Sequence, residues 1–316
     1  MRIVFMGTPD FAVASLDAIV KAGFEVAGVV TVPDRQTGRG LKMTGSPVKQ
    51  YALEHHLLLL QPEKLRNEHF LEQLRNLNAD LFVVVAFRML PVAVWSMPPL
   101  GTFNLHASLL PNYRGAAPIN WALINGETET GVTTFLLNER IDEGEILLQE
   151  KTPIADNDNA GSLHDRLATI GSKVVVKTIE GLASGLLKPQ AQPQTANPLP
   201  APKIFKEDCA IHWDWSGERI VNFVRGLSPY PAATMQMTDA KGKEHQIKVF
   251  DVRFEPSPKV NNDEPFSIKT LQNKRLFFSV SSGFIEILSL QLNGKKRNNA
   301  EEFLRGHDVM NWNLII

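Results

Sequence analysis

The chain has a single cysteine, Cys209, and no long apolar run. One cysteine cannot close an internal disulfide or supply a thiolate metal cage, which fits a reducing compartment. No stretch reaches the ~18 consecutive apolar residues that a membrane span needs. The N-terminal segment MRIVFMGTPDF breaks at Gly7 and Pro9, as a buried strand entering a turn does and a secretion signal does not. We therefore expect a cytoplasmic protein that binds no membrane.

The chain also has little net charge and no recognisable dinucleotide-binding motif. The formal net charge is −1, so any contact with nucleic acid must come from local basic clusters. MGTPDF lacks the three-glycine fingerprint of dinucleotide sites, which disfavours a nicotinamide dehydrogenase. His55 and His56 are adjacent on an expected helix, where neighbouring side chains point in different directions. The sequence predicts no metal site.

The order of patterns along the 316 residues predicts two domains. Residues 1–187 alternate apolar strands with helical stretches, which is typical of an α/β fold with a Rossmann-like, mainly parallel sheet. Residues 188–203 hold five prolines without apolar periodicity and read as a linker. Residues 204–316 place one amphipathic helix, 217–227, among short strands, which suggests a C-terminal OB-like β-barrel domain.

Within the first domain the apolar runs predict strands at 2–7, 24–31, 80–87 and 101–107. Thr8 is expected to cap a helix after the first strand. Further helices are expected over 46–60, opened by Ser46 and Pro47, and over 63–78, with a basic loop over 32–45 before them.

Asn104 and His106 are the first candidates for chemistry. They are two residues apart on one expected strand, so their side chains project from the same face of the sheet. They also lie at the carboxyl end of that strand, the edge at which open α/β sheets bind ligands. A lone histidine on a strand is more often structural, but the asparagine and the following Pro/Gly-containing loop favour a site.

Asp142 lies in the turn RIDEGE between two later strands, where a carboxylate is usually only a turn former. It gains a role only if the fold brings it to His106, because a carboxylate can orient an imidazole. The three groups together would suit acyl transfer from an amide-like donor to an amine. Asn104 and His106 could then donate hydrogen bonds to the oxyanion that forms on the attacked carbon.

Four basic residues lie in or next to the loop PDRQTGRGLKMTGSPVK: Arg35, Arg39, Lys42 and Lys49. Their spacing lacks the pattern of a phosphate-cradling P-loop. A solvated surface loop and a phosphate-binding loop both remain open on the residues alone.

The segment FNLHASLLPNYRGAAPINWALINGETETGV resembles the signature of the folate-dependent formyltransferase family, with its Asn-x-His pair and SLLPNYRG run. MGTPDFA, GRG, SPVK, IDEGEIL and LSPYPAA extend the resemblance over essentially the whole chain. It implies the formyltransferase fold and transfer of a formyl group from 10-formyltetrahydrofolate to the α-amino group of methionyl initiator tRNA. It also implies that Asn104, His106 and Asp142 are the catalytic residues.

The resemblance further implies a folate cleft and a tRNA surface. The folate residues would be Phe87, Arg88, Met89, Leu90, Ser108, Leu109, Leu110 and Pro111. The basic loop would enter the acceptor stem through Arg35, Arg39, Lys42 and Lys49, and the barrel domain would hold tRNA phosphates. We expect a monomer.

Two departures from the family pattern fall in these regions. The family usually has Ala-Tyr-Gly where this chain has Ala86-Phe87-Arg88, and a basic pair where it has Leu41-Lys42. The first departure could reshape the folate cleft, and the second could weaken a phosphate contact.

Related activities share the same catalytic groups. Enzymes that formylate glycinamide ribonucleotide or nucleotide sugars, and the hydrolase-like domain of formyltetrahydrofolate dehydrogenase, are the alternatives within the class. The basic loop and the C-terminal barrel favour tRNA over these. A non-catalytic tRNA-binding protein is the alternative from another class, and the intact Asn104, His106 and Asp142 disfavour it.

Overall fold

A computed structural model describes residues 1–37, 42–257, 267–281 and 283–315. It forms two compact units, each described here by itself. The first comprises Met1–Gly115, Glu129–Thr152 and His164–Pro200, and the second comprises Ala116–Thr128, Pro153–Leu163 and Ala201–Ile316. The domain boundaries expected from the sequence stay a prediction.

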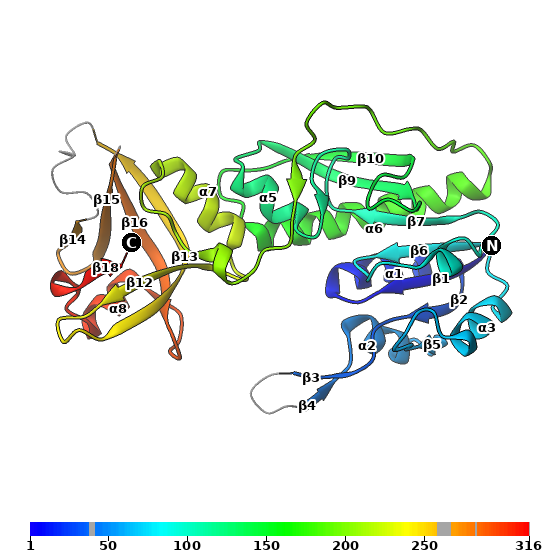
Figure 1. Ribbon diagram of the computed structural model, residues 1–316, viewed down its shortest axis with the longest axis horizontal. Coiled ribbons are helices and arrows are strands. Elements are labelled where there is room, and N and C mark those ends of the chain that lie inside the picture. The colour runs from blue at the N-terminus through cyan, green and yellow to red at the C-terminus, as the bar shows by residue number, and fades with distance from the viewer. Residues whose placement is uncertain (38–41, 258–266, 282, 316) are drawn as a thin grey trace. The chain divides into compact units, whose positions relative to one another are not determined.

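The first unit is built on a seven-stranded sheet with the order β10-β9-β7-β6-β1-β2-β5 (Figure 1). The five strands from β7 to β5 run parallel, and β9 pairs antiparallel with β7. The mainly parallel α/β sheet expected from the sequence is therefore confirmed. The strands are β1 (Arg2–Gly7), β2 (Glu25–Val30), β5 (Leu59–Leu60), β6 (Leu81–Val85), β7 (Thr102–His106), β9 (Glu129–Leu136) and β10 (Ile146–Pro153).

Apolar sequence and burial explain the central strands. All five residues of β6, LFVVV, are buried, as a strand covered on both faces requires. On one face, Phe70 and Leu74 of helix α3 pack into a core with Val4 and Phe82 of the sheet. The helices that lie wholly or mainly in this unit are α1 (Asp10–Lys21), α2 (Pro47–Glu54), α3 (Glu68–Asn76), α4 (Val92–Trp95) and α6 (Ala160–Ala183).

Several local expectations differ from the structure. Helix α1 begins at Asp10 after Pro9, without a side-chain cap from Thr8. Ser46 does cap α2, accepting a hydrogen bond from the backbone N–H of Lys49, but α2 ends at Glu54 and not at residue 60, because Leu59–Leu60 joins the sheet as β5.

The expected basic loop also contains secondary structure, since β3 (Arg35–Thr37) and β4 (Lys42–Thr44) pair antiparallel. The helix expected over 63–78 begins only at Glu68, where the side chain of Asn67 caps it.

The second unit contains a curled antiparallel sheet that forms a half-barrel, in agreement with the expected OB-like fold. Its strand order is β14-β15-β16-β13-β12-β18, with β17 paired to β16. The strands are β12 (Ala233–Thr238), β13 (Glu244–Pro256), β14 (Ile268–Leu271), β15 (Arg275–Val280), β16 (Gly283–Leu292), β17 (Asn298–Asn299) and β18 (Asn313–Ile315).

Helix α7 (Gly217–Leu227) closes the core of this second unit and has the bounds expected from the sequence. Ser216 caps it, and Ile220, Phe223 and Leu227 face the apolar core of the sheet. The remaining short elements of the chain are β8 (Arg114–Gly115), α5 (Pro118–Ile124), β11 (Pro200–Ala201), η1 (Glu207–Cys209), α8 (Ala300–Gly306) and η2 (Val309–Asn311).

Candidate functional site

Asn104 and His106 lie in the last three residues of β7, between β6 and β9. The His106 side chain is buried, with 6% of the residue exposed. Asn104 is partly buried, and its side-chain amide has no hydrogen-bond partner in the part of the chain that the structure describes. An amide left free at the carboxyl end of parallel strands is available to a ligand.

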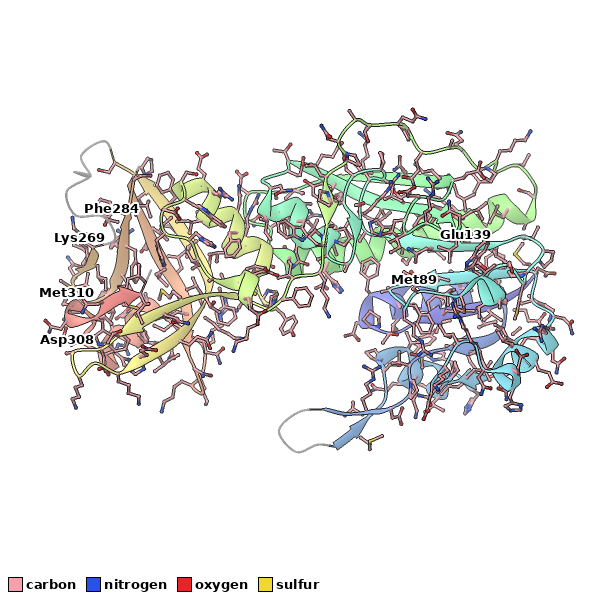
Figure 2. The ribbon with its side chains drawn as sticks, viewed as in Figure 1. Met89, Glu139, Lys269, Phe284, Asp308 and Met310 are labelled. Carbon is pink, nitrogen blue, oxygen red and sulfur yellow. The ribbon has the colours of Figure 1, made fainter. Side chains whose placement is uncertain are left out.

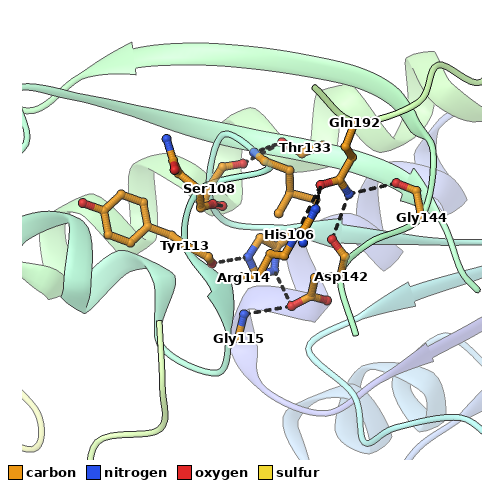
Figure 3. A network of polar contacts seen from close by, with 11 residues as sticks. His106, Ser108, Tyr113, Arg114, Gly115, Thr133, Asp142, Gly144 and Gln192 are labelled. Carbon is orange, nitrogen blue, oxygen red and sulfur yellow. Dashed lines mark hydrogen bonds and ion pairs between the residues drawn. The ribbon is translucent and has the colours of Figure 1, made fainter. Parts of the chain in front are cut away.

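The His106 imidazole stands between two oxygen atoms (Figure 3). Its Nε2 lies 2.7 Å from the backbone oxygen of Tyr113. A carbonyl only accepts hydrogen bonds, so we assign the proton to Nε2 in this contact. Its Nδ1 lies 3.9 Å from Oδ2 of Asp142, within ion-pair range but beyond a hydrogen bond. Contacts at both ring nitrogens therefore hold the imidazole in this orientation.

The Asp142 turn brings the third predicted group to this point. Asp142 follows β9 in sequence, and its Oδ2 accepts a hydrogen bond of 2.9 Å from the backbone N–H of Gly115. The same oxygen faces His106. Segments 36 residues apart in the chain thus meet at one site, a proximity that sequence spacing alone does not predict.

Left-handed backbone occurs on three loops next to this site. Ala86 after β6 has φ 47°, Tyr113 in the loop after β7 has φ 61°, and Asp142 has φ 55°. Non-glycine residues adopt such angles at a cost of order 1–3 kcal/mol each, and they persist only where surrounding contacts impose them. The backbone here is shaped by its tertiary contacts more than by local preference.

Two polar residues of the neighbouring strands hold the loop over 108–113. Thr133 of β9 donates from Oγ1 to the backbone oxygen of Ser108 at 2.7 Å and accepts from the N–H of Leu110 at 3.1 Å. Gln149 of β10 donates from Nε2 to the oxygen of Leu110 and to Oγ1 of Thr133, both at 2.9 Å. The sequence analysis missed these residues, because an isolated threonine or glutamine on a strand has no distinguishing pattern.

The residues predicted to bind folate differ in exposure. Met89 is 73% exposed, and it extends from the loop after β6 (Figure 2). Phe87 and Leu109 are partly buried. The remaining apolar and hydroxyl side chains of this set are buried, namely Leu90, Ser108, Leu110 and Pro111.

Arg88 makes its own contacts with the segment before α3. Its guanidinium donates to the backbone oxygens of Glu63, at 2.8 Å, and Pro62. Burial lowers the pKa of this guanidinium, and the nearby charge of Arg35 lowers it further. The side chain of the arginine at the family's usual glycine position is therefore held by the backbone of Pro62 and Glu63.

The four basic residues of the predicted tRNA loop are also not equivalent. Arg35 is exposed in β3. Nζ of Lys49 lies 2.6 Å from Oδ2 of Asp34, and this hydrogen bond is the main cause that lowers the pKa of Asp34. Arg39 and the side chain of Lys42 lie outside the described residues.

Two negative observations apply to the described part of the chain. No group of three or more His, Cys, Asp and Glu side chains there could hold a metal ion. None of the helices there is long and apolar enough to cross a membrane.

Solved structures of other proteins share the fold of this chain. An N-formyltransferase from Helicobacter canadensis, in complex with folinic acid and dTDP-3-aminofucose, superposes with a TM-score of 0.64 at 20% identity, covering 94% of this chain and 99% of that one. HypX from Aquifex aeolicus, in complex with tetrahydrofolic acid, has a TM-score of 0.64 at 18% identity. This second match covers 96% of the present chain but only 47% of HypX. At these identities the likeness concerns the fold.

Sequence comparison places the chain in a family. The model of the formyl transferase family matches residues 1–179, and that of the formyl transferase C-terminal domain matches residues 203–308. A methionyl-tRNA formyltransferase of Bacteroides fragilis is 54% identical over 309 residues, covering 97% of this chain and 95% of the relative. One from Flavobacterium johnsoniae is 50% identical over 307 residues, covering 97% and 96%. The chain therefore belongs to the formyl transferase family.

Proposed function

We propose that this protein transfers the formyl group of 10-formyltetrahydrofolate to the α-amino group of methionine on initiator tRNA, acting as a cytoplasmic monomer. The observation that carries the proposal is the meeting of His106 and Asp142, 3.9 Å apart, at the strand end that also bears Asn104. The Bacteroides fragilis relative, which bears the name of such an enzyme, supports it over nearly the full length of the chain.

The proposed chemistry needs no nucleophilic side chain. The attacking amine forms a bond to the formyl carbon, and the formyl oxygen takes up negative charge. The amide of Asn104 donates a hydrogen bond to that oxygen, and His106 supplies a second donor when its Nε2–H leaves the carbonyl of Tyr113. Asp142 keeps the imidazole oriented. As the carbon–nitrogen bond to the folate breaks, the amine loses a proton and the departing nitrogen gains one.

Exposed apolar side chains support a folate donor. Met89, in the predicted folate segment 87–90, is 73% exposed, and Ile141, next to Asp142, is 60% exposed. A flat pteridine ring would cover such side chains, and burying their surface would favour binding. The complexes of the Helicobacter canadensis and Aquifex aeolicus proteins with folinic acid and tetrahydrofolic acid agree with this class of ligand. We propose that 87–90 and 108–111 line the cleft.

For the tRNA we propose a phosphate-binding surface on the basic loop and on the C-terminal domain. We assign the main role in the loop to Arg39, with Arg35 and Lys42 beside it, and a smaller role to Lys49 because Asp34 already pairs with it. We also propose domains at 1–187 and 204–316, joined by 188–203.

If Arg39 contacts a tRNA phosphate, its removal should weaken the use of tRNA. Arg39→Ala is expected to raise the KM for charged tRNA several-fold and to reduce the salt dependence of tRNA binding by about one ion, with kcat changing less. Steady-state kinetics over a range of salt concentrations measure this. Unchanged kinetics at moderate salt would remove Arg39 from the proposed surface.

An acceptor panel tests the function as a whole. The full chain is incubated with 10-formyltetrahydrofolate and, in separate reactions, methionyl initiator tRNA, glycinamide ribonucleotide and an amino-sugar nucleotide. We expect formyl transfer to the charged tRNA alone. Preferred transfer to either small nucleotide would refute the proposed acceptor, and transfer to none of them would refute the proposed reaction.

A further inference from the structure

Gln192, in the proline-rich segment expected to be a linker, lies against the Asp142 turn (Figure 3). Its Nε2 donates hydrogen bonds to two backbone oxygens of that turn, those of Asp142 and Gly144, each at 2.8 Å. Both amide protons of this side chain are therefore used on the segment that carries the catalytic carboxylate.

The other end of the same amide contacts the loop after β7. Oε1 of Gln192 accepts from Arg114 at 2.6 Å through Nη2 and at 3.3 Å through Nε. Nη1 of Arg114 in turn lies 3.1 Å from Oε1 of Glu143, inside the Asp142 turn. One partly buried side chain thus joins the Asp142 turn to the segment whose backbone contacts His106 through Tyr113 and Asp142 through Gly115.

Backbone pairing places Gln192 at this point. Gln190 and Ile146 exchange two hydrogen bonds, with N···O distances of 2.7 and 2.8 Å, so the segment is registered against the start of β10. This pairing leaves Gln192 opposite the turn that precedes β10. Residues 190–192 therefore pack as part of the first unit.

The Asp142 turn needs such a contact. Asp142 has φ 55°, a left-handed conformation that a non-glycine residue keeps only when its surroundings impose it. Its Oδ2 must also stay between the N–H of Gly115 and Nδ1 of His106. The two bonds from Gln192 hold the main chain on both sides of Glu143, which fixes the direction in which the Asp142 carboxylate leaves the backbone.

From this geometry we infer that Gln192 is a positioning residue for formyl transfer, which acts by holding Asp142 in line with His106. The inference rests on the proposed function for its effect on the rate, but its effect on the turn can be measured without any substrate. It also makes the proline-rich segment part of the catalytic unit.

Two substitutions separate positioning from simple packing. Gln192→Met keeps the length of the side chain and removes all its hydrogen bonds. Gln192→Glu keeps an acceptor for Arg114, removes the two donors to the turn and adds a negative charge beside the turn. Gln194→Ala changes an exposed glutamine two residues further on and serves as the matched control.

The first measurement is hydrogen exchange, without substrate, of three hydrogen-bonded backbone amides at this junction: Gly115, which donates to Asp142, and Ile146 and Gln190, which pair with each other. Both Gln192 variants are expected to exchange faster than wild type by about 10-fold or more there, while Gln194→Ala is unchanged. Unaltered exchange in either Gln192 variant would overturn the inference, whether or not the protein proves to formylate tRNA.

The second measurement is formyl transfer to methionyl initiator tRNA. Each Gln192 variant is expected to lose on the order of 10- to 100-fold in kcat, with KM values within about 2-fold of wild type, because a misplaced catalytic group slows the chemical step. A loss with methionine but not with glutamate would assign the effect to Arg114 and overturn the inference. Failure of wild type to formylate tRNA would instead refute the proposed function.

A double-mutant cycle shows whether the effect passes through Asp142. In an Asp142→Asn background, Gln192→Glu is expected to change single-turnover rates by less than about 2-fold, since the carboxylate that it positions is already gone. The same 10- to 100-fold loss in both backgrounds would contradict a positioning role.

Discussion

His106 in the first unit and Glu286 in the second are both buried titratable side chains on central strands, but the protein treats them differently. They are 6% and 4% exposed. The imidazole has one hydrogen bond to a carbonyl and a carboxylate 3.9 Å away. The Glu286 carboxylate accepts two bonds from Arg275, Nε to Oε1 at 2.6 Å and Nη2 to Oε2 at 2.8 Å.

The difference indicates which buried polar group serves chemistry. Arg253, opposite Glu286 on β13, adds a second positive charge at 3.7 Å. The hydrogen bond from Arg275 lowers the pKa of Glu286, so the carboxylate stays charged inside the sheet. Its hydrogen-bonding capacity is used within the fold, whereas the side-chain amide of Asn104, beside His106, has no partner among the described residues. We therefore expect changes at His106 to affect rate and changes around Glu286 to affect stability.

The largest effect expected from this contrast is that of His106→Ala on formyl transfer. Loss of a group that moves protons or stabilises charge should reduce kcat by about 100-fold or more, with the melting temperature within a few degrees of wild type. Kinetics with methionyl initiator tRNA and thermal unfolding measure the two quantities. Near-normal turnover would place His106 in the same structural class as Glu286.

Gly144→Ala tests the Asp142 turn without touching a polar side chain. A Cβ at position 144 would lie 1.6 Å from the backbone oxygen of Leu136, so the turn must move. We expect a loss of about 10- to 100-fold in kcat from the displaced carboxylate. Gly306→Ala, where an added Cβ meets no described atom within 4 Å, is the control. Equal rates for the two variants would show that the turn does not position the site.

Arg275→Met probes the other side of the contrast. It removes the ion pairs of Arg275 with Glu286 and with Glu255, and among the described residues it leaves the buried Glu286 carboxylate with Arg253 alone. We expect a loss of about 2–3 kcal/mol in the free energy of unfolding. Lys274→Met, at the exposed neighbouring position, should change it by less than about 0.5 kcal/mol. Urea unfolding of both variants measures this. A similar stability for the two would mean that Glu286 does not depend on Arg275.

The smallest expected effect is a pH dependence of the same pair. Because the pKa of Glu286 is lowered in the fold, its stabilisation is present above the ordinary value of 4.5 and is lost as pH falls through the lower folded value. Wild type should therefore exceed Glu286→Gln in unfolding free energy by a constant amount near neutrality. This difference should shrink as the pH falls below 4.5. Unfolding from about pH 7 to about pH 3 measures this, and a difference that stays constant throughout would contradict it.

The sequence predicted the elements that local patterns define. Strands β6 and β7 and the bounds of α7 follow from their apolar patterns. The β3–β4 pairing was missed because each strand has only three residues and little apolar content. The helix expected to run to residue 60 stops early because Leu59 and Leu60 pair with β2 as β5.

The site was predictable only in part, for the same reason. Asn104 and His106 share a strand, so their common face follows from a spacing of two. The approach of Asp142 and of Gln192 depends on how β9, β10 and the proline-rich segment return to the end of β7, and no local signal records that. The family resemblance predicted a catalytic role for Asp142, but no sequence pattern predicted a role for Gln192.

The central claim is that Asn104, His106 and Asp142 converge on the formyl group during transfer. The most direct test is a crystal structure of the full-length protein with an unreactive analogue of 10-formyltetrahydrofolate. We expect the formyl oxygen about 3 Å from Nδ2 of Asn104, with the His106 ring beside it and Asp142 still facing Nδ1. An analogue bound with its formyl oxygen out of reach of both Asn104 and His106 would contradict the account.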